Sequence, residues 1–389
     1  MDSLVDTLKI IKSIVGEKYF SDDIAFARAL CSGVRHKRIE CSRCAAVCPV
    51  GAIEVGRSNV EIDSSKCTHC GACIAACPTQ ALSSTWLEWK ILVRDGLKSL
   101  ERTGGHPAVA CEKALAAAGL GKGAFGRGEI VSLPCLQRVD EALLMTLAAS
   151  GARSIHMVSG DCATCEVVGC GCASLQWLQA VKHAREMLEA VGSEVRIEVL
   201  DYSSESTAPA AASDGAAGSL TRRELFSGLR DEAGNAASVA LEQTMADSKY
   251  SAIAQVLGFD FAGGNSKLDA SRSRICQWAM VALAISAYGS PEQALQATGD
   301  KRIDTRVFAS IAIDLQKCTH CMLCEAYCRS HAIEKIMDDR KVAGLVLHPD
   351  RCVQCGVCAS MCRDSAIAIE PSVRVADILC ERATTVDFA

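Results

Sequence analysis

The clearest pattern of apolar and polar positions lies between residues 104 and 202, where short apolar runs alternate with helical stretches. Residues 139–147 are predicted to be a helix, because their apolar side chains recur at the spacing of one helical face. Strands and helices that alternate at this length are typical of a parallel sheet covered by helices. Four runs are predicted to be its strands: Pro107–Ala110, Ile130–Leu133, Ser154–Val158 and Val195–Leu200.

Outside this segment the pattern predicts separate helices and one linker. Residues 1–20 favour an amphipathic helix and lack the cleavage site of a secretory signal. The apolar run 275–289 is shorter than the roughly 18 residues that a bilayer requires, so a buried helix is expected. Thr221 and Glu224 form a capping box for a further helix. Residues 203–219 have almost nothing to bury and are predicted to be flexible.

The cysteine content changes this picture. The 389 residues include 24 Cys, which is high but below the roughly 8–10% of a small secreted disulfide scaffold. A chain this long can bury its own hydrophobic cores and does not need disulfides. Without a predicted export or spanning segment we expect the reducing cytoplasm, where abundant cysteines indicate metal or redox centres. The net charge of -5 gives a small argument against nucleic acid as a partner.

Most of the cysteines belong to one repeated spacing. The run Cys-x2-Cys-x2-Cys-x3-Cys begins at Cys67, Cys318 and Cys352, and an interrupted copy begins at Cys31. The copies end alike, in CPVGAI, CPTQAL, CRSHAI and CRDSAI. Thiolates are soft, anionic ligands suited to iron, and one short loop can hold three corners of a cluster. Structural zinc is the competing interpretation, but it gives no reason for the third cysteine or for four copies.

These runs resemble bacterial-type ferredoxins that bind two 4Fe-4S clusters. In that family the fourth cysteine of each run ligates the other cluster. The resemblance implies four 4Fe-4S clusters in two ferredoxin-like units. Their implied ligands are Cys31, Cys41, Cys44 and Cys77 (site I); Cys67, Cys70, Cys73 and Cys48 (site II); Cys352, Cys355, Cys358 and Cys328 (site III); and Cys318, Cys321, Cys324 and Cys362 (site IV).

Several side chains near these motifs carry further expectations. Arg329 and Arg363 replace the usual proline after the fourth cysteine, and a cation beside a cluster favours its reduced state. The C-terminal pair is therefore predicted to have the higher potentials, unless these arginines contact only solvent or the carboxylates of a partner. His69 and His320 are expected to be exposed neighbours rather than ligands. The basic insertion 35–38 is predicted to be a solvated loop.

Six more cysteines follow the predicted strands of the middle segment. The carboxyl ends of parallel strands share one edge, where ligands collect. A fifth site is therefore predicted there, with Cys170 and Cys172 as candidates to replace either member of the pair that follows the third strand. The alternatives are a redox-active dithiol at that pair and inert thiols. The cysteines predicted to form this middle site are Cys111, Cys135, Cys162 and Cys165.

The same segment resembles a second family. VACEK, LPCLQRVDEALL and SGDCATC are similar to the iron-sulfur delta subunit associated with methyl-viologen-reducing hydrogenase and heterodisulfide reductase. That resemblance implies a 2Fe-2S centre and an electron relay between a catalytic subunit and a flavoprotein. A 4Fe-4S cluster is also compatible with four cysteines.

The sequence thus predicts an α+β multidomain chain: two ferredoxin-like units flank a small α/β domain with a parallel sheet, and a helical segment precedes the second unit. Cys276 and Cys380, which are isolated, are expected to be small buried hydrophobic residues. The predicted domains are 1–103 (two-cluster ferredoxin domain with flanking helices), 104–202 (α/β domain), 203–219 (linker), 220–306 (helical segment) and 307–389 (two-cluster ferredoxin domain).

These features predict an electron-transfer subunit, a polyferredoxin, of a cytoplasmic oxidoreductase complex with no nucleic acid and no membrane span. The sequence has no nucleotide-binding glycine fingerprint, P-loop, flavin signature or His/carboxylate constellation. The resemblances imply a molybdenum or tungsten enzyme, a hydrogenase or a heterodisulfide-reductase-like flavoprotein as the catalytic partner. The alternative is an iron-sulfur disulfide reductase that uses the middle cysteines. A redox sensor would need an output module, which is not recognisable here.

Overall fold

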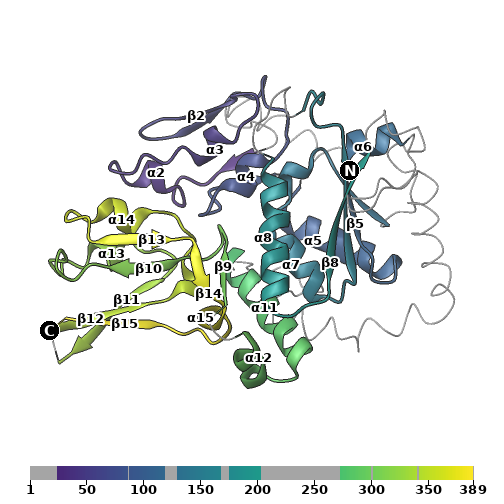
Figure 1. Ribbon diagram of the computed structural model, residues 1–389. Helices are drawn as coiled ribbons and strands as arrows, with labels where there is room; N and C mark the ends of the chain where they lie inside the picture. The colour runs from purple at the N-terminus through teal and green to yellow at the C-terminus, as the bar shows by residue number, and fades with distance from the viewer. Residues whose placement is uncertain are drawn as a thin grey trace, which may run out of the picture.

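The computed structural model describes residues 24–85, 87–118, 129–167, 175–202, 272–298, 301–339 and 341–388. Two ferredoxin-like units lie one above the other, and a parallel-sheet domain lies beside them (Figure 1). The predicted helix 1–20, the linker 203–219, the capping box at Thr221, and Cys170 and Cys172 lie outside the described residues.

The middle domain is built on a four-stranded parallel sheet with the order β6-β5-β7-β8. These are the four strands that the apolar runs predict, with ends that differ by one or two residues. The central strands β5 and β7 are almost entirely buried, as expected for a parallel sheet covered by helices. The strands are β5 (Ala108–Cys111), β6 (Ile130–Leu133), β7 (Ser154–Gly160) and β8 (Arg196–Tyr202).

One helix of this domain, α5, precedes the first strand, and the other helical elements lie between the strands along the chain. Residues 139–147 were expected to be helical from Val139, but α7 begins at Glu141, because the Asp140 carboxylate accepts a hydrogen bond from the Leu143 N–H and caps the helix. A 3-10 turn, η2, precedes this cap. The helical elements are α5 (Trp89–Arg102), α6 (Glu112–Ala117), η2 (Leu136–Arg138), α7 (Glu141–Ala149) and α8 (Gln176–Ala190).

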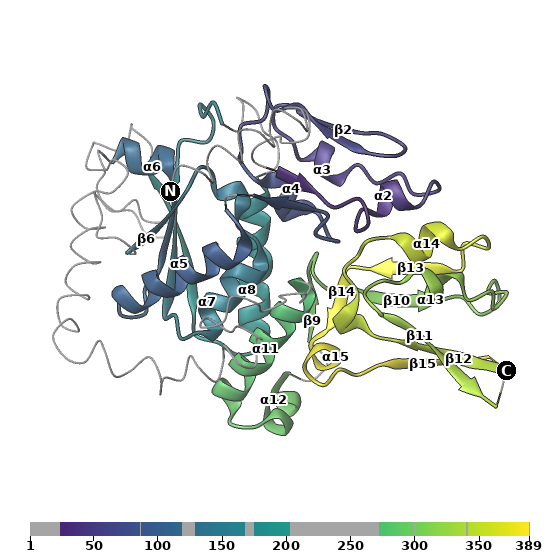
Figure 2. The ribbon, with the colours of Figure 1, turned by 180° about the vertical axis from the view of Figure 1, so that it is seen from behind.

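The predicted apolar helix is α11 (Arg272–Tyr288), and it joins two parts of the molecule. It packs against α7, and Ile275, Met280 and Leu283 are buried in the same hydrophobic core as the sheet. Both views show α11 between the parallel-sheet domain and the C-terminal unit (Figures 1 and 2). A shorter helix, α12 (Pro291–Thr298), follows. Among the described helices none is long and apolar enough to cross a bilayer.

The two ferredoxin-like units repeat one architecture. In each, an outer antiparallel pair of strands encloses the cysteine motifs, and an inner pair connects them. The N-terminal unit contains β1 (Ile24–Phe26), α2 (Ser32–Arg35), α3 (Arg43–Ala46), β2 (Ile53–Val55), β3 (Val60–Ile62), α4 (Ala72–Ala76) and β4 (Leu82–Ser84). The C-terminal unit contains β10 (Ser310–Ile313), α13 (Leu323–Tyr327), β11 (Ile333–Asp338), β12 (Lys341–Leu347), η3 (Pro349–Arg351), α14 (Val357–Met361) and β13 (Ile367–Glu370).

Extra elements attach the C-terminal unit to the middle domain. The strand β15 (Thr384–Asp387) extends the inner sheet, and a separate pair is formed by β9 (Arg302–Asp304) and β14 (Ser372–Arg374). After β14, α15 (Val375–Leu379) packs against α11 and α12. Side chains of this region, such as Phe308, belong to the core of the middle domain. The base of the C-terminal unit therefore shares the hydrophobic core of the middle domain, whereas the part that carries the cysteines has a smaller core of its own.

Candidate iron-sulfur centres

The cysteine loops share an unusual backbone conformation. The residue before the second cysteine has a left-handed φ in three motifs, at His69 (56°), His320 (54°) and Gln354 (54°). The third residue after the fourth cysteine is left-handed in all four, at Gly51, Gln80, His331 and Ser365. This conformation is unfavourable for residues other than glycine and persists where the surrounding structure requires it. Its recurrence at equivalent positions shows that the loops have a common shape.

The recurring alanine after each motif has a structural role that the sequence did not explain. Its backbone N–H donates to the sulfur of the fourth cysteine, four residues earlier, and the alanine itself is buried. Hydrogen bonds of this kind stabilise a thiolate. The four bonds run from Ala52 to Cys48 (3.2 Å), Ala81 to Cys77 (3.3 Å), Ala332 to Cys328 (3.2 Å) and Ala366 to Cys362 (3.3 Å).

The four cysteines of site I lie around one small cavity in the N-terminal unit. Burial, together with repulsion from the nearby thiols of Cys77, Cys41 and Cys31, raises the pKa of Cys44 to about 11. The cysteine that follows the insertion thus joins the group as the spacing implies.

Site II is assembled in the same way on the other side of that unit. Burial raises the pKa of Cys73, and repulsion from Cys70, Cys67, Cys44 and Cys48 acts in the same direction. Cys44 belongs to site I, so the two sites are close enough to interact. Cys67 Sγ lies 3.8 Å from His69 Nδ1, and that histidine is only partly exposed.

The C-terminal unit repeats this grouping. At site III, burial raises the pKa of Cys352 to about 12, with contributions from Cys355 and Cys328. At site IV, burial, together with repulsion from Cys318 and Cys321, raises the pKa of Cys324 to about 11. The predicted fourth member of site IV, Cys362, lies at the end of α14, which packs against α13, the helix that carries Cys324. His320 is exposed, as expected, and stacks on Phe388.

The residues at these four sites fit an iron-sulfur cluster. Burial and mutual repulsion disfavour several neighbouring thiolates, and a bound cationic metal core relieves both effects. The backbone N–H groups that donate to the sulfur atoms favour the thiolate form of those cysteines. All cysteines in the described ranges are free thiols. Within those ranges, no three His, Cys, Asp or Glu side chains converge on a point suited to a single metal ion.

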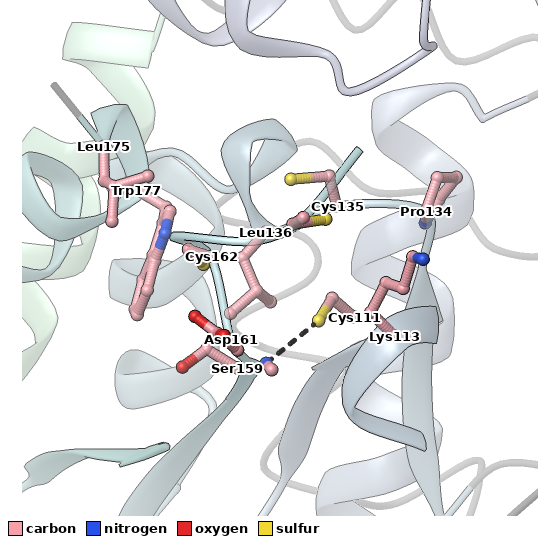
Figure 3. Close-up of a pocket in the computed structure, with 12 residues that line it drawn as sticks. Cys111, Lys113, Pro134, Cys135, Leu136, Ser159, Asp161, Cys162, Leu175 and Trp177 are labelled. Carbon is pink, nitrogen blue, oxygen red and sulfur yellow. Dashed lines mark hydrogen bonds between the residues drawn. The ribbon is translucent and has the colours of Figure 1, made fainter. Parts of the chain in front are cut away.

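The four cysteines predicted for the middle site line one pocket at the carboxyl edge of the parallel sheet (Figure 3). Cys111 ends β5, Cys135 follows β6, and Cys162 and Cys165 follow β7. Cys111 Sγ accepts hydrogen bonds from the backbone N–H groups of Ala114 and Gly160, both at 3.4 Å. The shared edge of the strands therefore brings these thiols together, as the sequence predicted.

Electrostatics at the middle site resemble those of the ferredoxin-like sites. Burial raises the pKa of Cys135 to about 12, and the thiols of Cys70, Cys111 and Cys162 contribute. Burial also raises the pKa of Cys162 to about 11, with further contributions from Cys111, Cys165 and two aspartates. Cys70 is a member of site II, so the middle site and site II are neighbours. The two also share an apolar cluster of Cys70, Ala72 and Cys135, with Cys162, Cys165, Val47 and Val167 against it.

The two ferredoxin-like units also contact each other, which the order of domains along the chain did not suggest. Arg43 Nη2, in the site I motif, donates to the Gln354 carbonyl oxygen in the site III motif at 2.7 Å. His36 packs edge to face against Tyr327, with ring centroids 4.8 Å apart. The prediction of a solvated basic loop at 35–38 is therefore wrong for His36, which is buried in this contact.

Two other expectations change. Arg329 and Arg363 are both exposed, but Arg329 donates to the Ala29 carbonyl oxygen of the N-terminal unit rather than facing only solvent or a partner carboxylate. The prediction of higher potentials in the C-terminal pair stays a prediction. Cys276 is fully buried, as expected, but Cys380 is exposed, because it follows the last turn of α15 at the surface.

Comparison with known proteins identifies the repeated units. Residues 37–81 and 317–366 each match the family described as 4Fe-4S dicluster domain. The chain therefore contains two 4Fe-4S dicluster domains, which imply 4Fe-4S clusters in each ferredoxin-like unit. The middle domain lies outside both matches, and its similarity to the hydrogenase-associated delta subunit remains a prediction.

Similar stretches occur in three curated proteins. The chain is 52% identical over 44 residues to a subunit of the ion-translocating oxidoreductase complex of Methanosarcina acetivorans, a match that covers 11% of this chain and 17% of that protein. It is 38% identical over 52 residues to a subunit of the Na(+)-translocating ferredoxin:NAD(+) oxidoreductase complex of Acetobacterium woodii, 13% of this chain and 16% of that one. It is 46% identical over 39 residues to a 7Fe ferredoxin of Hydrogenibacillus schlegelii, 10% of this chain and 50% of that one. The chain thus matches only 16–50% of the length of these relatives.

Proposed function

We propose that this chain is an iron-sulfur electron-transfer subunit that relays electrons between redox partners of an oxidoreductase complex. The observation that carries the proposal is a continuous series of contacts between the cysteine groups. These contacts link the middle site to site II, site II to site I, and site I to the C-terminal unit. A loaded cluster accepts and releases one electron at a time. What the chain contributes is the position, burial and hydrogen bonding of each centre.

The first part of the relay is the junction between the middle site and site II. Cys135 and Cys70 share one apolar cluster, and Thr68 Oγ1 donates to the Val167 carbonyl oxygen at 2.6 Å. Thr68 lies between two predicted ligands of site II, and Val167 follows the Cys162 pair. These contacts hold the two loops together, which supports electron transfer in either direction.

The second part is the junction between the two ferredoxin-like units. The Arg43 guanidinium bonds to the loop that contains Cys352 and Cys355, and its charge acts on Cys355, where it opposes the effect of burial on the pKa. Arg43 is adjacent in sequence to Cys44 of site I. The proposed order of centres is therefore middle site, site II, site I, site III and site IV.

We further propose that Cys111, Cys135, Cys162 and Cys165 hold a fifth cluster. Their convergence on one pocket and the burial of Cys111 and Cys135 support this assignment. The raised pKa of Cys162, next to Asp161 and Asp201, argues against the alternative of a reactive dithiol, because the nucleophile in disulfide exchange is the thiolate.

Iron and acid-labile sulfide counts on the anaerobically prepared full chain test the fifth cluster. Cys135→Ser should lower both counts by one cluster and leave the signals of the ferredoxin-type clusters intact. Cys276→Ser is the matched control, since Cys276 is buried away from the pocket. Equal iron in the Cys135 variant and the parent would contradict the fifth cluster. Loss of disulfide turnover in Cys165→Ser at unchanged iron would support the reductase instead.

The relay itself is tested by anaerobic reductive titration of the full chain, monitored by electron paramagnetic resonance. The chain should take up at least one electron for each 4Fe-4S cluster that the two dicluster domains imply. Uptake of no electrons by an iron-loaded chain would contradict an electron-transfer role.

The partner is proposed from the relatives and from the resemblance of the middle domain. Two relatives are named as subunits of oxidoreductase complexes. We propose a catalytic subunit of the same general kind, such as a molybdenum or tungsten enzyme, a hydrogenase or a heterodisulfide-reductase-like flavoprotein, in the reducing cytoplasm. Anaerobic co-purification from the native host would identify the partner, and a chain recovered without any redox protein would contradict this part of the proposal.

A further inference from the structure

A group of three charged side chains lies at the junction between the middle domain and site II, with Arg138 and Asp140 buried and Arg272 half-buried. Asp140 stands between two arginines: its Oδ2 is 3.1 Å from Arg272 Nε and 3.9 Å from Arg138 Nη1. Arg138 is 5% exposed and Asp140 is 2% exposed. Two cations and one carboxylate leave this triad with an excess positive charge in a buried place.

Among the residues that the structure describes, the neighbouring groups do not balance that charge. Glu141 follows Asp140 in the chain, but its Oε1 accepts from Arg306 Nε at 2.6 Å and from His183 Nδ1 at 2.9 Å. Its Oε2 accepts a second bond from Arg306 at 3.2 Å. Glu88 and Lys90, which line the adjacent cavity, are exposed and opposite in charge. A buried charge without a counter-charge is costly, so the excess needs another anion nearby.

Arg138 is placed directly against the loop of site II. A Cβ on Gly71 would lie 2.7 Å from Arg138 Cδ, so the arginine packs on the backbone between Cys70 and Cys73. Arg272 donates to the carbonyl oxygens of Ala75 and Ile74, in the helix that carries Cys73. Both cations of the triad therefore contact the element that presents a predicted ligand of site II.

Arg138 also retains hydrogen-bonding capacity. Within the described residues, its Nε and Nη1 atoms are buried and have no hydrogen-bond acceptor. The thiolate of Cys73 is close enough to act on Arg138, where it opposes the lowering of the arginine pKa by burial. The side chain is thus a desolvated cation next to a site where four thiolates would add negative charge.

We propose that the Arg138–Asp140–Arg272 triad is the counter-charge of site II and raises the reduction potential of the cluster held there. This inference rests on the proposed function, since it requires a cluster at site II. A cluster with four thiolate ligands is anionic and becomes more negative on reduction, so a fixed buried cation favours the reduced state. Site II would then be the point at which electrons collect between the middle domain and site I.

Redox titration of the full chain tests the triad with two variants that change its charge, and so the reduction potential, in opposite directions. Arg138→Gln removes a positive charge and should disfavour reduction of one centre about tenfold, or about 59 mV for one electron. Asp140→Asn removes the negative charge, retains an oxygen for the helix cap, and should shift the same centre in the opposite direction. The affected centre is identified as the one whose spectrum changes in Cys70→Ser.

Arg94→Gln is the matched control, because that arginine is exposed and pairs with its neighbour Asp95. It should leave every potential unchanged. The proposal is overturned if the Arg138 and Asp140 variants keep their iron and show the parental potentials. It is also overturned if both variants lower the reduction potential of that centre, because general disruption of the site would have this effect. A parent chain without iron at site II would instead contradict the proposed function.

Discussion

At the scale of single residues, buried charge holds the parts of this molecule together. Glu141, at the start of α7, is bound by His183 of α8 and by Arg306, which precedes β10. Burial alone would raise the pKa of this carboxyl, but the hydrogen bond from His183 and the charge of Arg306 lower it to about 2. One carboxylate therefore links the middle domain to the C-terminal unit.

Glu141 gives a prediction for stability against pH. Because its pKa falls from 4.5 in the unfolded chain to about 2 in the folded one, its contribution is complete above pH 4.5 and is lost as the pH falls toward 2. Glu141→Gln should lower the free energy of unfolding at pH 7 by about 3 kcal/mol. Denaturant unfolding of the full chain measures this free energy, and Glu101→Gln, at an exposed residue, is the control. A variant as stable as the parent at pH 7 would show that the ion pairs contribute nothing.

At the scale of elements, three short helices of the ferredoxin-like units, α4, α13 and α14, begin after a left-handed residue, unlike α2 and α3. Gly71 precedes α4 and Gly356 precedes α14, both at φ 77°, and Met322 precedes α13 at φ 59°. This turn redirects the chain between two cysteines of one loop. Gly71 and Gly356 are equivalent in the repeat but differ in their surroundings, because only Gly71 is covered by Arg138.

This difference predicts unequal effects of the same substitution. Gly356→Ala meets no atom within 4 Å and should cost only the left-handed backbone, about 1–2 kcal/mol. Gly71→Ala adds a clash with Arg138, for which about 1–3 kcal/mol more is expected. Denaturant midpoints of the two loaded variants would compare them. If Gly356→Ala were the more damaging change, the contact between η2 and the site II loop would not matter for stability.

At the scale of the whole molecule, one large hydrophobic cluster joins the parallel-sheet domain to the base of the C-terminal unit, and each ferredoxin-like unit has a smaller cluster of its own around its cysteines. Side chains of the parallel sheet, α11 and the base of the C-terminal unit belong to one hydrophobic cluster, which includes Val109, Met280 and Val375. The N-terminal unit rests on this body through η2 and through Arg43 and His36. The proposed relay would therefore not need domain movement to bring neighbouring centres together.

The two junctions of the relay should differ in their electrostatic strength. Arg43 is exposed and its charge is screened by water, whereas Arg138 is buried. Arg43→Gln should therefore lower the potential of site III by less than Arg138→Gln lowers that of site II. Redox titration monitored by electron paramagnetic resonance compares the two. A larger shift in the Arg43 variant would contradict the role assigned to burial.

The sequence by itself determined the features that depend on local spacing. Cysteine intervals defined the loops, the resemblance to two-cluster ferredoxins implied the members of each thiol group, and apolar periodicity located the strands and α11. The middle site was also accessible, because the carboxyl ends of parallel strands share an edge. The domain boundaries inferred from composition stay predictions, and the linker at 203–219 lies outside the described residues.

The tertiary structure alone decided which groups are neighbours across the chain. Arg43 and Gln354 are 311 positions apart, and no periodicity relates them. Cys276 and Cys380 are equally isolated in sequence, yet one is buried and the other is exposed. Spacing specifies local turns, whereas burial and the pairing of charges depend on which surfaces pack together, and that is a property of the complete fold. The proposed order of the centres and the proposed counter-charge at site II therefore depend on the tertiary structure.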